Sequence, residues 1–512
     1  MLKRLLSGLA AIFLSLSLIA PAHAKGWLRA DTPHFVIYSE GSDAETREFA
    51  LDVERFDALL RQMFEVPDHE EPNRLTIYML KSAGTVAKLY GQKYVAGFYS
   101  PDAEGSYAVT NRVRSGDKLQ LTGQITLFHE YAHHFMYRNF TNAYPAWYRE
   151  GFAEFVSTAT FDKKGNWKYG FPAMHRAYDL LTTQIPIEKV LFSERYEFKD
   201  REQADFYAWS WALVHMLTWS DTRKGQLADY ITRFAAGAGP EEAAKVFGDL
   251  DKLQSDLRRY ATGRMSYLSS GAPIVWSGKI AVTPLDPITS DYVELSLARR
   301  MGGTPLPTRN ALRALSARAP GNADVLFELA QAERNLVTKD DPSGYALAGA
   351  AVDQALAIAP RHMRANVLKA ELEMHRLGDG KITDPAQWKA MRQFIGTANR
   401  ADPKSPVPLI AYFQTFMLEG RKPTPLALAG IASAFAQQPE SREVRLLYVL
   451  GLANDKQFAL ARGLLTVLVY DPHASEVGKK ALAVLDRMER QGLSLKAATK
   501  AVEEAEKAES KP

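Results

Sequence analysis

Two histidines four residues apart enclose a glutamate in the segment FHEYAHHF. A step of four residues turns an α-helix by about 400°, so the imidazoles of His129 and His133 lie one above the other on one helix face. Glu130 lies about 100° round from His129, within reach of a water molecule held between the histidines and a metal. This H-E-x-x-H pattern is typical of a helix that supplies two zinc ligands and a general base for hydrolysis.

A second acidic pair follows on the next predicted helix, in the segment WYREGFAEF. Glu150 and Glu154 are again four residues apart and therefore share a helix face. Because catalytic zinc takes three protein ligands and keeps one position for water, we predict that Zn²⁺ is bound by His129, His133 and Glu150. Glu130 would then take the proton of the water, and Glu154 would orient a ligand histidine as a hydrogen-bond acceptor.

The bare H-E-x-x-H pattern also arises by chance, so the residues around it matter. The first helix has an apolar stripe beside its histidines, at Ile125, Phe128, Ala132, Phe135 and Met136. The second helix begins near Pro145 and contains Gly151, which costs about 1 kcal/mol relative to alanine inside a helix. We interpret Gly151 as a point of close backbone approach, as expected for a metal held between two crossing helices. His134 points about 100° away from His133 and is predicted to be structural.

The two segments together resemble the gluzincin metallopeptidases, especially the peptidase MA-like group related to the M1 aminopeptidases. The resemblance covers residues 30–265, and its specific part is residues 129–155. It implies a zincin-like fold with zinc ligands at His129, His133 and Glu150. It also implies a general base at Glu130 and a supporting carboxylate at Glu154. The chain lacks the G-x-M-E-N element with which M1 aminopeptidases hold the amino terminus of a substrate, which favours endopeptidase or another amide-cleaving activity.

A zinc hydrolase also needs a hydrogen-bond donor that stabilises the oxyanion of the tetrahedral intermediate. Tyr207 lies in the aromatic segment DFYAWSWALVH and resembles the tyrosine at the start of the equivalent helix in MA-like peptidases. We therefore predict Tyr207 as the donor. His215 and His175 are less favoured candidates, and the aromatic residues of this segment are also ordinary core material.

Residues 1–24 have the features of a secretory signal peptide. Lys3 and Arg4 precede an apolar run, and Ala22-His23-Ala24 forms a cleavage site. The apolar run is short for a bilayer span, and an uncleaved membrane anchor is the alternative. The chain has no cysteine and a formal net charge of +4 over 512 residues, so it has neither disulfides nor a concentration of positive charge for nucleic acid. We predict a periplasmic or secreted protein without a membrane span after signal cleavage.

The predicted fold class is α+β. Residues 25–120 form an N-terminal α/β lobe, with strands at 33–39, 74–80, 95–99 and 106–110 and helices at 43–65 and 82–90. Residues 121–267 form the helical zinc-binding lobe. From the gluzincin plan we expect Ser106–Thr110 to be a sheet edge that pairs with extended substrate, and an edge without this role is the alternative.

The C-terminal half is rich in alanine and leucine and is predicted to be helical. Residues 268–300 read as a strand-like linker, 301–495 as helical repeats and 496–512 as a charged, solvated tail. Helix-ending prolines recur at steps scattered around the tetratricopeptide (TPR) period of about 34 residues, at Pro320, Pro360, Pro403, Pro439 and Pro472. The pattern resembles a divergent TPR solenoid, whose concave surface would bind peptides or a protein partner. A plain helical bundle is the alternative.

These observations predict an exported zinc metallopeptidase that hydrolyses peptide bonds and uses its repeats to recruit a peptide or protein substrate or a partner. The alternative is a non-catalytic periplasmic TPR adaptor that carries an inactive peptidase-like domain. The enzyme is favoured because His129, Glu130, His133 and Glu150 are all present, whereas an inactive descendant would be expected to lose one of them.

Overall fold

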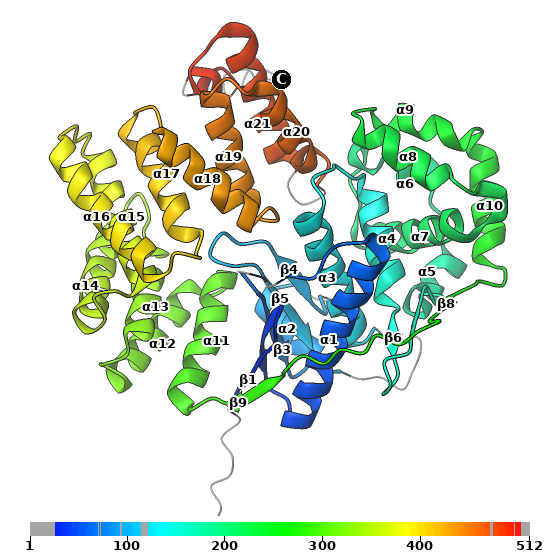
Figure 1. The fold of residues 1–512 in the computed structure, drawn as a ribbon, viewed down its shortest axis with the longest axis horizontal. Helices are drawn as coiled ribbons and strands as arrows, with labels where there is room; N and C mark the ends of the chain where they lie inside the picture. Colours follow the sequence, from blue (N-terminus) through cyan, green and yellow to red (C-terminus); the bar gives the residue numbers. More distant parts are fainter. Residues whose placement is uncertain are drawn as a thin grey trace, which may run out of the picture.

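The computed structural model describes residues 26–69, 71, 73–92, 95–113, 121–471, 475–495 and 497–502. A small sheet lies at the centre, a helical lobe lies on one side of it, and a helical C-terminal region curves round the other side (Figure 1). The predicted α+β class is confirmed at this level. The predicted signal peptide, residues 1–24, lies outside the described residues. No helix of the described part combines the length and apolar character that a bilayer crossing requires.

In the described part of the chain the central sheet has six strands, in the order β4-β5-β3-β2-β1-β9. The strands are β1 (Leu28–Asp31), β2 (Phe35–Ser39), β3 (Leu75–Leu80), β4 (Phe98–Ser100), β5 (Tyr107–Asn111) and β9 (Ala281–Pro284). Strands β2, β3 and β5 are parallel, and the other pairings are antiparallel. The prediction of an edge at Ser106–Thr110 is wrong, because β5 pairs with β3 on one side and β4 on the other. The short strand β4 takes the edge.

Alternate side chains of β3 enter two separate hydrophobic cores, one on each face of the sheet. Leu75, Ile77 and Met79 pack in the larger core with the helices α1 (Asp43–Phe64) and α3 (Gly123–Asn139). Tyr78 and Leu80 pack in a smaller core with the helices α2 (Ala83–Tyr90) and α11 (Pro287–Met301). Because successive side chains of a strand point to opposite faces, this alternation buries β3 on both sides.

The two helices of the N-terminal lobe, α1 and α2, lie close to their predicted ranges. The longer helices of this lobe and the helical lobe are α1 (Asp43–Phe64), α2 (Ala83–Tyr90), α3 (Gly123–Asn139), α4 (Ala146–Ser157), α7 (Asp200–Trp219), α8 (Gln226–Ala235) and α10 (Leu250–Ala261). The short ones are α5 (Ala177–Thr182), α6 (Ile187–Leu191) and α9 (Pro240–Ala244). A small second sheet joins β6 (Thr160–Phe161), β7 (Trp167–Tyr169) and β8 (Leu268–Ser269).

Helix α3 is fixed at its first residue against the end of β5. Thr122 caps the helix by accepting a hydrogen bond from the backbone of Ile125. The hydroxyl of Thr110 on β5 donates to the carbonyl of Gly123 over 2.7 Å. A Cβ at Gly123 would lie only 1.6 Å from the carbonyl oxygen of Asn111, so this contact requires glycine. The sheet therefore sets the position from which the histidine helix starts.

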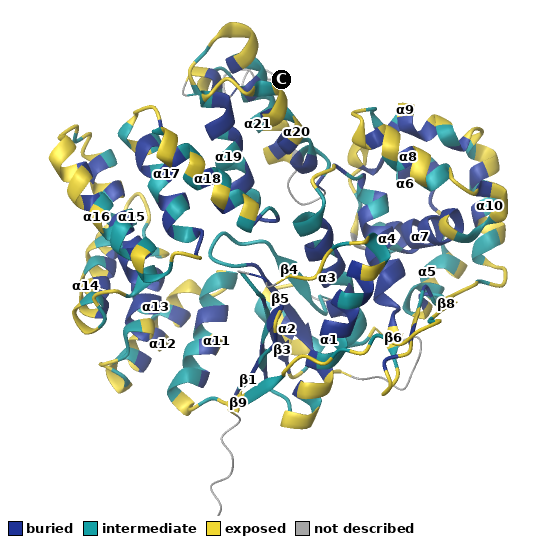
Figure 2. Cartoon of the chain, viewed as in Figure 1, coloured by how far each residue is buried: buried dark blue, intermediate teal, exposed yellow. Residues whose placement is uncertain are grey.

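Gly151 on α4 marks a close backbone approach, as predicted, but the expected reason is wrong. A Cβ at Gly151 would lie 2.4 Å from the carbonyl oxygen of Ser210 and 2.7 Å from Cγ2 of Val214. Both residues belong to α7, which is buried along most of its length (Figure 2). The glycine therefore lets α4 pack deeply against α7, on the side away from α3.

The C-terminal region consists of consecutive helices that pack on their neighbours along the chain. They are α11 (Pro287–Met301), α12 (Pro305–Arg318), α13 (Ala323–Arg334), α14 (Ser343–Ile358), α15 (Met363–Asp379), α16 (Pro385–Ala401), α17 (Val407–Glu419), α18 (Pro425–Gln437), α19 (Arg442–Asn454), α20 (Phe458–Val469) and α21 (Ser475–Gln491). Pro320, Pro360, Pro403 and Pro439 each stand in the turn between an even-numbered helix and the next. Pro472 lies outside the described residues.

This helical region contacts the rest of the protein at both of its ends. At the first end, β9 pairs with β1 and α11 packs on the sheet, so residues 268–300 contribute to the central layer instead of only connecting two parts. At the other end, Arg138 of α3 donates to the carbonyl of Gln437, and Tyr137 donates to Asp471. The predicted solvated tail is wrong at its start, because Ala498 is buried in the last helical core.

The close contact between α4 and α7 predicts that a larger residue in place of Gly151 destabilises the protein. Gly151→Ala should lower the free energy of unfolding by about 1–3 kcal/mol, because the added methyl group overlaps the backbone of α7. The matched control is Gly349→Ala in α14, where a Cβ meets nothing within 4 Å. The control should stabilise the protein by up to about 1 kcal/mol. Thermal and denaturant unfolding would measure both, and equal effects of the two substitutions would contradict the packing described.

Candidate metal centre

Helices α3 and α4 bring His129, His133 and Glu150 together, as predicted. The Nε2 atoms of the two histidines are 3.1 Å apart, and each lies 3.4 Å from Oε2 of Glu150. The carboxylate is buried, and the two imidazoles are about 15% exposed. The three ligand atoms therefore form a nearly equilateral triangle with one open side.

The size of this triangle fits a zinc ion. In tetrahedral coordination with bonds of about 2.0–2.2 Å, neighbouring ligand atoms are separated by about 3.3–3.6 Å. Two of the observed separations, 3.4 and 3.4 Å, lie in this range, and the third, 3.1 Å, is slightly shorter. Two imidazoles and one carboxylate are also a ligand set that zinc uses in catalytic sites, where a fourth position stays open.

Electrostatics at the triangle favour a positive charge. Burial lowers the pKa of His129, but the hydrogen bond to Glu150 and the nearby carboxylates outweigh it and raise the pKa to about 9. Burial raises the pKa of Glu150, but the charge of His133 and hydrogen bonds from both histidines hold it well below its usual range. A proton or a metal ion can supply the favoured charge, and the two compete for the same nitrogen.

Glu154 lies behind His129, in the supporting position that the spacing predicted. Its Oε1 is 3.5 Å from Nδ1 of His129, while Nε2 of that ring faces the other ligands. Two further groups hold the carboxylate: Nε2 of His175 at 2.8 Å and the guanidinium of Arg176 at 2.5 Å. Burial raises the pKa of Glu154, but the charge of Arg176 and the hydrogen bond from His175 outweigh it, so the carboxylate stays ionised.

Sequence reasoning missed the role of Arg176 and assigned His175 to a different task. Both residues lie at a 3₁₀ turn, Met174–Arg176, where no helical or strand periodicity points to a shared face. The available signal was indirect: a buried glutamate needs cationic or hydrogen-bonding partners, but the sequence does not show which of the nearby basic residues supply them. His175 hydrogen-bonds to Glu154, which makes it a support of that carboxylate.

Glu130 and Tyr207 lie beside the triangle, near His129. Within the described residues the half-buried carboxylate of Glu130 has no hydrogen-bond or ion-pair partner. The ring of Tyr207 lies 6.3 Å from the ring of His129, and the guanidinium of Arg176 lies 5.4 Å from the tyrosine ring centre. Burial and the charge of Glu150 raise the pKa of Tyr207, so its hydroxyl remains a hydrogen-bond donor.

His134 and His215 lie away from the triangle. The imidazole of His134 contacts the hydroxyl of Tyr99 at 3.0 Å, and burial lowers its pKa to about 3, which agrees with the predicted structural role. His215 contacts the hydroxyl of Tyr260 at 2.7 Å and the carbonyl of Gly170 at 3.0 Å. Both nitrogens of His215 are therefore engaged elsewhere, and its candidacy as the oxyanion donor is wrong.

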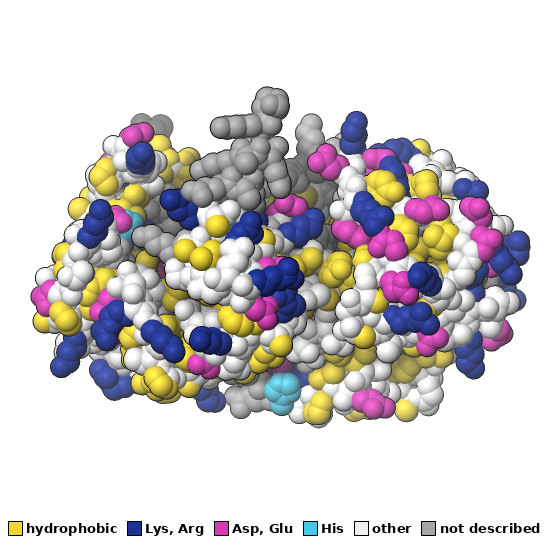
Figure 3. Space-filling view, turned by 90° about the horizontal axis from the view of Figure 1, so that it is seen from above, with side chains coloured by type: hydrophobic (Ala, Val, Ile, Leu, Met, Phe, Trp, Pro, Cys, Tyr) yellow, Lys and Arg dark blue, Asp and Glu magenta, His cyan; other side chains and the backbone are white. Residues whose placement is uncertain are grey.

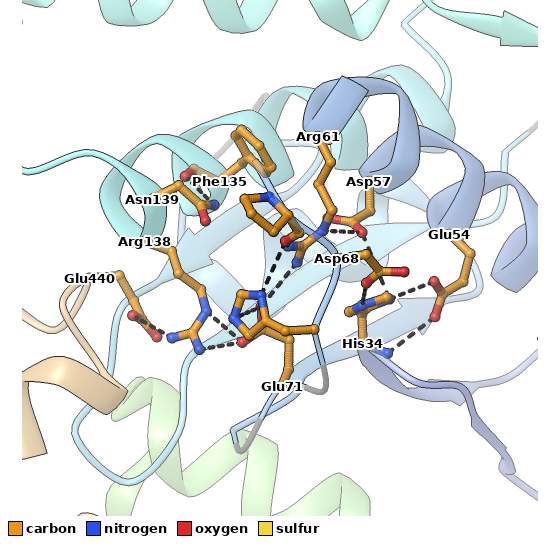
Figure 4. A network of polar contacts seen from close by, with 12 residues as sticks. His34, Glu54, Asp57, Arg61, Asp68, Glu71, Phe135, Arg138, Asn139 and Glu440 are labelled. Carbon is orange, nitrogen blue, oxygen red and sulfur yellow. Dashed lines mark hydrogen bonds and ion pairs between the residues drawn. The ribbon is translucent and has the colours of Figure 1, made fainter. Parts of the chain in front are cut away.

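A second buried group, His34 with Glu54 and Asp57, also brings possible metal ligands together. Here Nδ1 of His34 contacts Glu54 at 2.8 Å, and Arg61 pairs with Asp57 at 2.8 Å (Figure 4). Nε2 of His34 also contacts Asp68 at 3.0 Å. Burial lowers the pKa of His34, but the hydrogen bond to Glu54 and the charge of Asp57 outweigh it and raise the pKa to about 9. Because both ring nitrogens of His34 and the carboxylate of Asp57 already have partners, we interpret the group as an internal ion network.

Comparisons of the chain with protein-family models, with curated proteins and with solved structures give no match.

The raised pKa of His129 gives the candidate centre a pH dependence. A metal must displace the proton from this ring, so the apparent affinity for Zn²⁺ should rise by about tenfold per pH unit up to about pH 9. Competition with a fluorescent chelator over a pH series would measure the slope. His133→Gln should abolish binding at every pH, whereas His375→Gln, at an exposed position on α15, should leave it unchanged. An affinity without pH dependence would contradict this account of His129.

Proposed function

We propose that the protein is a zinc-dependent metallopeptidase of the gluzincin type. The observation that carries the proposal is the triangle of His129, His133 and Glu150, whose dimensions suit a zinc ion, with Glu130 beside it. A zincin-like fold for the sheet and helical lobe and a TPR-like solenoid for the C-terminal helices are parts of the same proposal. The predicted signal sequence supports an exported, periplasmic or secreted enzyme.

In this proposal each residue has a definite task. His129, His133 and Glu150 hold the ion, and Glu154 fixes the orientation and tautomer of His129. Zinc bound there would supply a Lewis acid that polarises the scissile carbonyl and makes water a nucleophile at neutral pH. Glu130 accepts the proton of the attacking water and delivers it to the leaving amine. Tyr207 donates a hydrogen bond to the oxygen on which negative charge develops.

The substrate in this proposal is a peptide or a protein. On the face seen in Figure 3, Lys and Arg side chains are interspersed with Asp, Glu and apolar ones and do not gather in one patch. This distribution supports a protein ligand more than a nucleic acid. A non-catalytic adaptor is the competing function, and the experiment below separates the two.

Glu130→Gln should retain the metal and lose hydrolysis by about 10²–10⁴-fold, because the amide cannot accept the proton of the water. The measurement is digestion of a proteome-derived peptide library by zinc-loaded wild type and variant, with metal content determined in parallel. Glu197→Gln, at an exposed glutamate in the same lobe, should cleave like the wild type. If zinc-loaded wild type cleaves nothing while the helical region captures a defined protein, the adaptor function replaces the enzyme.

Tyr207→Phe should lower kcat by about 10²-fold with little change in KM or zinc content, because only the transition state uses the hydroxyl. The exposed tyrosine Tyr178 on α5 provides the matched control, Tyr178→Phe, which should behave like the wild type. A kcat of Tyr207→Phe within a factor of about 2 of the wild type would remove this residue from the mechanism.

A further inference from the structure

The loop between β4 and β5 reaches into the inner side of the arc formed by the C-terminal helices (Figure 1). Arg300 of α11 donates to Asp102 at 2.9 Å and to the carbonyl of Gly105 at 2.6 Å. Gln331 of α13 donates to Glu104 at 3.2 Å, and Ala103 packs against the apolar core of α17–α19. The tip of the sheet is thus one wall of the concave surface.

A cavity of about 870 Å³ remains between this loop and helices α13, α15, α17 and α19. This volume lies within the usual range of ligand pockets, about 300–1,000 Å³. Its apolar walls include Leu368, Leu372, Ile410 and Met417. It is distinct from the candidate metal centre, since none of the residues that line it belongs to α3 or α4.

The charged groups that line the cavity are mainly acidic. The lining contains five carboxylates and two guanidinium groups: Asp102, Glu104, Glu371, Asp379 and Glu443, with Arg334 and Arg364. Asp102 is paired with Arg300, and Asp379 lies 3.0 Å from Nδ1 of His375. Arg334 pairs with Glu371, and Arg364 lies 3.6 Å from Glu104. Glu443 has no cationic partner among the described residues and accepts only from the amide of Gln414 at 3.3 Å.

A second, independent feature also points to a hydrogen-bond donor as the ligand. Gln331 lines the cavity and is 2% exposed. Its Nε2 donates to Glu104, but its Oε1 has no hydrogen-bond partner in the described structure. A buried acceptor without a partner costs about 1–3 kcal/mol, which a donor group on a ligand would recover.

We propose that this cavity binds a peptide segment that carries both basic and apolar side chains. The basic groups would pair with Glu443 and donate to Gln331, and the apolar groups would occupy the walls formed by α15 and α17. The proposal concerns binding alone and does not depend on hydrolysis at the metal centre.

The test measures fluorescence anisotropy of a short labelled peptide of alternating leucine and arginine with the full-length Glu130→Gln variant, which leaves the probe intact. Glu443→Lys, at an exposed position on α19, should lower the affinity by about tenfold or more. The matched control Glu476→Lys makes the same charge change on α21, at a side chain that is 79% exposed, and should change affinity by less than about twofold.

Two further peptides test whether binding requires both the basic and the apolar side chains. A leucine–glutamate peptide should bind at least about tenfold more weakly than the leucine–arginine peptide, and so should a serine–arginine peptide, which lacks the apolar side chains. Equal binding of the leucine–glutamate peptide, or equal effects of Glu443→Lys and Glu476→Lys, would overturn the proposal. Since the assay uses a hydrolysis-deficient variant, a failure of the proposed peptidase function would leave this result unaffected.

Discussion

The rest of the structure depends on one constraint, which is the close approach of three electron-pair donors in a largely buried place. Nε2 of His129, Nε2 of His133 and Oε2 of Glu150 lie within 3.4 Å of one another. A positive charge among two imidazole nitrogens and a carboxylate oxygen stabilises such a close group. The raised pKa of His129 has this cause, because the hydrogen bond to Glu150 and the nearby carboxylates favour the protonated ring and outweigh its burial. The arrangement also requires two helices at fixed separation, which the glycine contacts of α3 with β5 and of α4 with α7 provide.

Helices α3 and α4 are braced by residues from distant parts of the chain. Arg149, next to Glu150, donates to Tyr137 at 2.6 Å and also to the carbonyl of Tyr470, which follows α20. Arg138 pairs with Glu71 and lies 3.3 Å from Glu440, so the ion network that begins at His34 continues into the C-terminal helices (Figure 4). The C-terminal region therefore helps to hold α3 and α4, and with them the candidate metal centre, in place.

The candidate ligands could be predicted from the sequence because their spacing follows the helix period, which is a local property. The turn prolines were informative for the same reason. Strand pairing is not local: nothing in Tyr107–Asn111 itself shows that the three residues of β4 cover its outer edge. The partner of Gly151 and the two side chains that hold Glu154 also depend on tertiary contacts, so the residue types predicted a need for partners without identifying them.

The pairing of Leu28 with Pro284 joins the first described strand to one that is synthesised much later. Until residue 284 has emerged, the outer edge of β1 has no partner, and an unpaired edge is a template for aggregation. The order of strands thus delays completion of the central sheet until residue 284 is available. Contacts so distant in sequence also make folding slow.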